Sequence, residues 1–177
     1  CLNFGNPEHP EVMWQFSEAV DGMSEACLAF GVPVVGGNVS FYNESQGSDI
    51  DPTPVIGMLG LVDELVRRPP STGLTEGGRL VLIGVTQPEL SGSVVAQRRG
   101  MGGGKLPGLD YAQHLAIAGV VRDLVTGGLV TGVHDVGHGG LGLALAEMAV
   151  RSGIGFQAAR IADDAALFSE SPSRAVV

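Results

Sequence analysis

Residues 33–44 read Pro33-Val-Val-Gly-Gly-Asn-Val-Ser-Phe-Tyr-Asn-Glu44, and the first part of the chain is organised around them. A short β-branched run meets two glycines, after which polar and apolar residues alternate. Side chains alternate between the two faces of a β-strand, so Val39 and Phe41 are expected on one face and the polar residues between them on the other. The pattern therefore predicts a strand with one polar face.

The polar face of this strand carries groups that bind ligands. Asn38 offers a carbonyl oxygen to a hard cation, and Ser40 offers a hydroxyl to a phosphate or a sugar. Gly36 and Gly37 can adopt backbone angles closed to other residues, and they let a ligand or another backbone approach closely. A bulged strand with a solvated polar face fits the spacing equally well, because a glycine pair beside an asparagine is common at turns.

The composition is that of a globular chain. Of the 177 residues, 44% are hydrophobic and only 16% are charged. The net charge of −9 argues against a nucleic-acid surface, although a phosphorylated ligand could still bind through backbone amides, magnesium or an arginine cluster. Two cysteines give no disulfide framework or metal spacing, and no apolar run is long enough to span a bilayer. We therefore expect a cytoplasmic protein without nucleic-acid or membrane partners.

Helical and extended segments alternate along the chain, which predicts the α/β or α+β class. Helices are predicted at residues 10–30, 110–126, 139–152 and 163–168. Strands are predicted at residues 33–42, 54–61, 79–84, 129–136, 156–161 and from 174 onward, and loops at residues 1–10, 46–52 and 89–104. Residues 65–78, which include Arg67-Arg68-Pro69-Pro70, are interpreted as a linker between a first domain (1–64) and a second (79–177). The sequence lacks an initiator methionine and stops within a predicted strand, so we expect a piece of a longer chain.

Residues 133–140, Val-His-Asp-Val-Gly-His-Gly-Gly, join a predicted strand to a predicted helix, a place where ligands often bind. His134, Asp135 and His138 could hold a metal ion. The alternative, in which Asp135 caps a turn and the histidines are merely polar, fits their loose spacing better. The Glu-Leu-Ser-Gly-Ser run at 89–93 is only loosely similar to a phosphate nest, and neither cysteine has a base near it in sequence.

Several segments together resemble one family. They are residues 1–16 (Cys-Leu-Asn-Phe-Gly-Asn-Pro-Glu-His-Pro-Glu-Val-Met-Trp-Gln-Phe), 33–44, 52–60 (Pro-Thr-Pro-Val-Ile-Gly-Met-Leu-Gly), 133–141 and the closing run 168–174 (Phe-Ser-Glu-Ser-Pro-Ser-Arg). Over nearly its whole length the chain resembles the second half of the synthetase subunit of the phosphoribosylformylglycinamidine synthase (formylglycinamide ribonucleotide amidotransferase) family. The first two segments are very specific.

The resemblance implies an aminoimidazole-ribonucleotide-synthetase-like fold. Residues 1–64 would be the C-terminal part of a smaller, ferredoxin-like, ATP-binding unit, and residues 79–177 most of a larger α/β unit. The implied activity is a ligase of de novo purine (IMP) biosynthesis. It would use ATP and Mg²⁺ to activate an amide of formylglycinamide ribonucleotide as an iminophosphate, which glutamine-derived ammonia then attacks to give the amidine.

The resemblance also implies site residues and partners. Gly37 would approach ATP, Asn38 would help to bind Mg²⁺ and Ser40 would contact the ribonucleotide substrate. Asp135 is carried only as a further candidate, because His138 stands where the family usually has an acidic residue before Gly-Gly-Leu. No catalytic residue is expected here, since the family's catalytic histidines lie in the first half. That half would pair with this one as a pseudo-dimer, alongside a fused or separate glutaminase and small accessory subunits.

Two other functions remain open. One is another ATP-using member of the superfamily, such as aminoimidazole ribonucleotide synthetase or selenophosphate synthetase, and residues 1–16 argue against it. The other is a non-catalytic interaction module that only completes the pseudo-dimer. Nucleotide binding by the isolated chain, measured beside turnover of a full-length one, would separate these functions.

Overall fold

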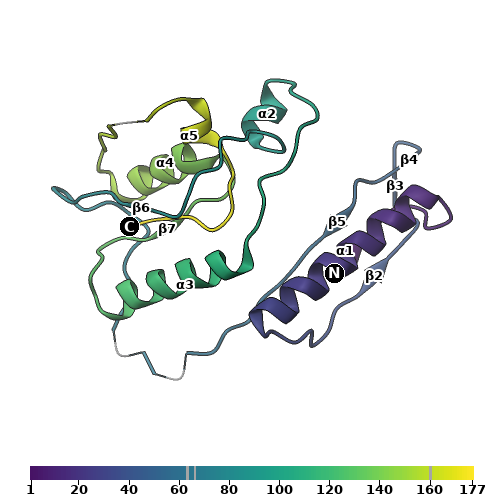
Figure 1. Cartoon of the computed structure of the whole chain (residues 1–177), viewed down its shortest axis with the longest axis horizontal. Coiled ribbons are helices and arrows are strands. Elements are labelled where there is room, and N and C mark those ends of the chain that lie inside the picture. The colour runs from purple at the N-terminus through teal and green to yellow at the C-terminus, as the bar shows by residue number, and fades with distance from the viewer. Residues whose placement is uncertain (63, 66, 160) are drawn as a thin grey trace. The chain divides into compact units, whose positions relative to one another are not determined.

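A computed structural model describes residues 1–62, 64–65, 67–159 and 161–177 (Figure 1). The chain divides into two compact units, residues 1–63 and residues 64–177, each with its own sheet and core. Helices and strands occur in both units, so the predicted mixed class is confirmed. Within the described residues, no helix is both long enough and apolar enough to cross a membrane.

The first unit is built on a small mixed sheet. Strand β1 (Leu2–Asn3) lies in the middle, parallel to β2 (Val39–Ser40) and antiparallel to β5 (Thr53–Pro54). A separate hairpin pairs β3 (Glu44–Ser45) with β4 (Ser48–Asp49). The loop predictions are therefore wrong at β1 and β4, whose two-residue strands are too short to leave a hydrophobic alternation in the sequence.

Helix α1 (Pro10–Phe30) has the bounds that its periodicity predicts. Pro10 suits the first turn because its missing N–H needs no partner there, and Gly31 ends the helix with a left-handed φ of 63°. The side chains that join the helix to the sheet form one cluster: Leu2, Phe4, Val12, Phe16, Ala19, Val20, Met23 and Phe41. Within it the Phe4 and Phe16 rings meet edge to face at 5.5 Å, so one stripe of α1 fixes β1 in place.

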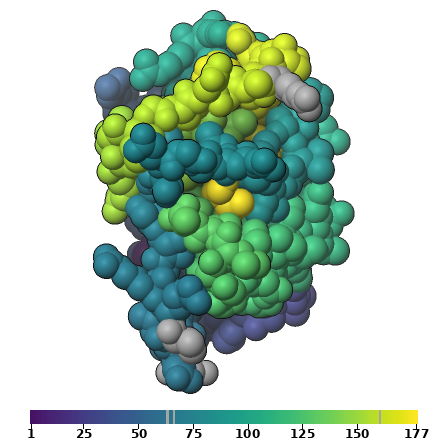
Figure 2. Space-filling view, turned by 90° about the vertical axis from the view of Figure 1, so that its left-hand side faces the viewer, coloured from purple at the N-terminus to yellow at the C-terminus, as the bar shows by residue number. Residues whose placement is uncertain are grey.

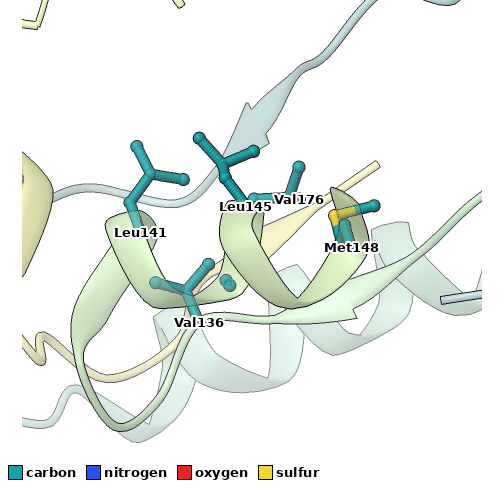
Figure 3. Packing of buried hydrophobic residues seen from close by; sticks show 6 residues of the cluster. Val136, Leu141, Leu145, Met148 and Val176 are labelled. Atoms are coloured by element: carbon teal, nitrogen blue, oxygen red, sulfur yellow. The ribbon is translucent and has the colours of Figure 1, made fainter. Parts of the chain in front are cut away.

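The second unit contains an antiparallel sheet in the order β6 (Leu82–Ile83), β8 (Ala175–Val176) and β7 (His134–Asp135). Helix α4 (Gly140–Ser152) packs on it. Figure 3 shows the apolar side chains at this contact, and the buried cluster consists of Val136, Leu141, Ala144, Leu145, Met148 and Val176. The predicted helix at 139–152 is confirmed to within one residue, because Gly139 is the N-cap.

The remaining helices each begin after a side-chain N-cap; they are α2 (Val94–Arg98), α3 (Tyr111–Thr126) and α5 (Asp164–Phe168). The caps are Ser93, Asp110 and Asp163, whose side-chain oxygens accept a backbone N–H from the first turn at 2.9–3.1 Å. The prediction of Asp110 as a cap is confirmed. The predicted loop at 89–104 is wrong, because it contains α2.

Five strand predictions are too long, including the one at 79–84, of which only β6 (residues 82–83) is a strand. Only residues 39–40 of the segment 33–42, residue 54 of 54–61 and residues 134–135 of 129–136 lie in strands, and residues 156–159 and 161 form none. A strand needs a neighbour for its backbone N–H and C=O groups, and these segments find only short partners among the described residues. Several of their apolar side chains are exposed; Val35 and Leu59, for example, are 97% and 93% exposed.

Candidate functional site

The three principal candidates, Gly37, Asn38 and Ser40, lie on or next to β2, which is an edge strand of the first unit's sheet. The backbone N–H of Leu2 donates to the Asn38 carbonyl at 2.9 Å, and that of Phe4 donates to the Ser40 carbonyl at 3.0 Å. These bonds hold the segment against β1, and the apolar cluster under α1 anchors β1 in turn. A rigid core thus positions an otherwise exposed segment.

Gly36 and Gly37 are both exposed, and neither has a positive φ. The structure therefore does not use the conformational freedom that the sequence suggested for them. A Cβ placed on either residue would meet no atom of the described chain within 4 Å. The space beside Gly37 is open on the protein side, so a ligand could reach this backbone directly.

Ser40 is half-buried, and its hydroxyl contacts a residue that sequence reasoning missed. The Ser40 Oγ lies 3.2 Å from Asn43 Oδ1 and 3.1 Å from Asn43 Nδ2. Between them Tyr42 adopts a left-handed φ of 58°, which is unusual for a bulky residue and turns the chain so that Asn43 faces back toward Ser40. The only signal in the sequence was an Asn three residues after a Ser, which does not reveal a contact.

A second polar cluster in the first unit joins the start of α1 to β4. Asp49 accepts hydrogen bonds from the Asn6 backbone N–H and from His9 Nδ1, both at 2.7 Å. The Asn6 N–H first, and the His9 side chain second, lower the pKa of the Asp49 carboxyl below its ordinary value. The contact spans about forty residues of sequence, so local patterns could not predict it.

Asp135 belongs to the second unit, whereas Gly37, Asn38 and Ser40 belong to the first. Its carboxylate is 89% exposed, beside His134, whose Nε2 lies 3.2 Å from Glu147 Oε2. Among the described residues, no three or more His, Cys, Asp or Glu side chains are grouped to hold a metal ion. The metal site considered for His134, Asp135 and His138 is therefore not formed within this part of the chain.

Two hollows in the described part of the second unit bear on the site. The larger, of about 1090 Å³, is lined mainly by residues 73–80, 82, 153–159 and 161 and by the C-terminal strand, and it contains none of the predicted site residues. Figure 2 shows this face, with the yellow C-terminal end visible between a teal and a green segment. The smaller, of about 180 Å³, is lined by His134, Asp135, His138 and Glu147. Asp135 thus lines this small polar hollow.

The closing segment 168–174 forms a polar network inside the second unit. Arg174 is only 5% exposed and donates to the backbone carbonyls of Ser169 and Ser171 at 2.6 and 3.0 Å. Burial lowers the pKa of the Arg174 guanidinium below its ordinary value. Glu170 Oε1 accepts the backbone N–H of Val94 at 2.8 Å and that of Gly139 at 2.9 Å. This segment therefore holds together the starts of α2 and α4.

Two family models match the chain in order. The model described as "AIR synthase related protein, N-terminal domain" matches residues 1–62, and "AIR synthase related protein, C-terminal domain" matches residues 75–177. A solved structure, "T. maritima PurL complexed with ATP", is similar with a TM-score of 0.45 and 19% identity, over 89% of this chain and 26% of that one. A TM-score of this size does not establish a shared fold.

Curated relatives match over the whole chain. The sequences named "Phosphoribosylformylglycinamidine synthase subunit PurL" from Leifsonia xyli and Thermobifida fusca are 47% and 48% identical, covering 100% of this chain. The one from Moorella thermoacetica is 48% identical over 98% of it. In each case the chain spans only 24% of the relative's length. Because the C-terminal model alone covers more than half of the residues, the chain belongs to the AIR synthase related protein family.

Proposed function

We propose that these 177 residues are a segment of a longer phosphoribosylformylglycinamidine synthase chain. That enzyme would convert formylglycinamide ribonucleotide and glutamine-derived ammonia to the amidine in purine (IMP) biosynthesis, with ATP as the activating reagent. The observation that carries the proposal is the 47% identity over the full chain to relatives of that name. Both family models, in the expected order, support it.

The two units correspond to the N-terminal and C-terminal domains of the family, in the order in which the two family models match. Residues 1–64 are the C-terminal part of the smaller ATP-binding unit, residues 65–78 are the linker, and residues 79–177 are the larger unit. The proposed partners are the first half of the longer chain, a glutaminase and small accessory subunits, in the cytoplasm. The exposed apolar side chains of residues 34–62 support a partner for the first unit, because a surface of this kind is rarely left open to water.

Within the first unit, Gly37 approaches ATP, Asn38 supplies an oxygen to Mg²⁺ and Ser40 contacts the ribonucleotide. The open space beside Gly37 and the exposure of Asn38 fit these roles. One neutral amide oxygen cannot hold Mg²⁺ alone, so most ligands would be ATP phosphate oxygens, waters and groups outside these residues. When bound, Mg²⁺ would neutralise charge on the ATP phosphates.

The work of this chain is positioning rather than proton transfer. The sheet and α1 fix the β2 segment, so Gly37, Asn38 and Ser40 would meet their ligands without rearranging. Asp135 of the second unit remains a further candidate for binding magnesium or the nucleotide. The groups that attack and protonate lie outside these residues, so the isolated chain binds ligands weakly at most and makes no amidine.

Steady-state kinetics on a chain of the relatives' full length that carries these residues tests the proposal. The wild type should form amidine with ATP, Mg²⁺ and ammonia. Asn38→Ala should raise the Mg²⁺ and ATP requirements and lower kcat, because one metal ligand is lost. Gly37→Val should be worse, since a branched side chain fills the space beside the backbone. Ser24→Ala, which removes an exposed hydroxyl bonded only to its own helix, is the matched control.

Two results would overturn the proposal. The first is wild-type turnover and Mg²⁺ dependence in Asn38→Ala, with an unchanged melting temperature in all variants. The second is ATP- and ammonia-dependent amidine formation by the purified 177-residue chain, because near-attack geometry would then be complete without the groups assigned to the missing part.

A further inference from the structure

Asn43 ties both strands of the candidate site together through one side chain. Its Nδ2 lies 2.9 Å from the Phe4 carbonyl oxygen on the β1 side and 3.0 Å from the Ser40 carbonyl oxygen on β2. Its own backbone N–H donates to Phe4 and its carbonyl accepts from Ile50, at 3.3 and 3.1 Å. Asn43 is thus held by two hydrogen bonds of its side-chain amide and two of its backbone.

These contacts decide which way the amide faces. If the group were turned over, Oδ1 would lie against two carbonyl oxygens, which are acceptors only, and both contacts would be repulsive. With Nδ2 in that place, its two hydrogens match the two carbonyls. Both donors of the Asn43 amide are therefore used on the Phe4 and Ser40 backbone.

The direction of the Ser40 hydroxyl follows from this assignment of the two Nδ2 hydrogens. Nδ2 also lies 3.1 Å from Ser40 Oγ, the longest of its three contacts, so we assign its two hydrogens to the two carbonyl oxygens. Asn43 Oδ1 is then the acceptor for the Ser40 hydroxyl, 3.2 Å away. The Ser40 proton accordingly points to Oδ1, and the lone pairs of Oγ face the remaining directions. Tyr42, between the two residues, has a strained φ, so regular strand geometry does not by itself bring Asn43 to Ser40.

We propose that Asn43 is a positioning residue that turns the Ser40 hydroxyl into a hydrogen-bond acceptor for the substrate. Ser40 then recognises an O–H or N–H donor of the ribonucleotide, either a ribose hydroxyl or an amide, and does not donate to its phosphate. This inference rests on the proposed function, because Ser40 is taken from it as a substrate contact. It adds that the substrate donates the hydrogen bond in that contact, and that Asn43 is the residue that decides this direction.

A ligand series tests the polarity of Ser40 without touching Asn43. Binding to the long chain is measured by calorimetry for formylglycinamide ribonucleotide, its dephosphorylated nucleoside, and the 2′-deoxy and 3′-deoxy nucleosides. Ser40→Ala should raise Kd about two- to tenfold, the effect of one lost hydrogen bond between uncharged groups. The ratio of variant to wild-type Kd should be the same with and without the phosphate.

The deoxy ligands identify the donor. A ratio that falls to one with a deoxy nucleoside assigns the bond to that ribose hydroxyl, and a ratio that survives in both assigns it to an amide N–H; either supports the acceptor role. A ratio that falls to one when the phosphate alone is removed would overturn it, because Ser40 would then be a phosphate donor.

A double-mutant cycle tests the role of Asn43. Asn43→Ala should raise Kd as much as Ser40→Ala does, and it should have no further effect in the Ser40→Ala background. Asn43→Asp keeps an acceptor for the Ser40 proton but loses both bonds to the carbonyls. Its melting temperature should fall while its Kd for the uncharged nucleoside stays near that of the wild type, and Ser24→Ala should change neither.

Independent, additive effects of Ser40→Ala and Asn43→Ala on Kd would overturn the positioning role. So would an Asn43→Asp variant whose Kd rises, and whose melting temperature falls, as much as in Asn43→Ala. These failures are distinct from failure of the proposed function. In that case the wild-type long chain would neither bind the ribonucleotide nor form amidine.

Discussion

Glu170 is expected to be one of the most destabilising positions to alter in the second unit. Its Oε1 accepts the backbone N–H of Val94, the first residue of α2, and that of Gly139, the N-cap of α4. Hydrogen bonds to a charged acceptor are each worth about 1.5–3 kcal/mol. Glu170 is half-buried, so water partly replaces it and the lower end applies. Removing both bonds should cost about 3 kcal/mol of unfolding free energy.

Urea denaturation of the 177-residue chain, followed by far-UV circular dichroism at low protein concentration, measures this loss. Glu170→Ala should show the full decrease, and Glu170→Gln should lose only about 1 kcal/mol, because it keeps an acceptor oxygen without the charge. Glu76→Ala, an exposed glutamate of the same unit, should lie within about 0.5 kcal/mol of wild type. If Glu170→Ala unfolds at the same urea concentration as Glu76→Ala, the two bonds do not stabilise the unit.

Three further outcomes are expected. Because the pKa of Asp49 is lowered in the folded state, its contribution to stability is present above about pH 4 and is lost as the pH falls through the folded pKa; Asp49→Asn should flatten this acid dependence, as read from the fluorescence of Trp14, the only tryptophan. Met148→Ala should cost about 2–5 kcal/mol by leaving a cavity in the α4 core, whereas Met101→Ala, at an exposed methionine, should cost little in the same denaturation experiment. The 177-residue chain should self-associate despite its charge of −9, because apolar side chains such as Leu59 are exposed, and a constant monomer mass in light scattering over a wide concentration range would contradict this.

The sequence by itself determined the helices. Helix α1 begins at Pro10 and ends before Gly31 as its periodicity and end signals indicate, and Asp110 caps α3 as predicted. Such signals act within one or two turns, so the residues that decide them are neighbours in the chain. Helix α2 was missed because its five residues are too short for a periodic pattern.

The same locality explains why the candidate segment was found. The run from Gly36 to Ser40 carries its chemistry in consecutive residues, and its resemblance to a family needs no tertiary contact. What the sequence could not supply was the state of those groups. Only the structure shows that the Asn43 side chain bonds to the backbone of Phe4, beside β1, and of Ser40, on β2. These bonds leave Asn43 Oδ1 to accept the Ser40 proton.

Tertiary structure alone decided the strands and the long-range polar contacts. The predicted strand at 33–42 shrinks to two residues, because a strand extends only as far as a neighbour pairs with it. Asp49 meets His9 across 40 residues of sequence, and Glu170 meets Val94 across 76. No local pattern encodes these separations; they arise because packing of the apolar faces of α1 and α4 on their sheets brings distant polar groups within hydrogen-bond reach.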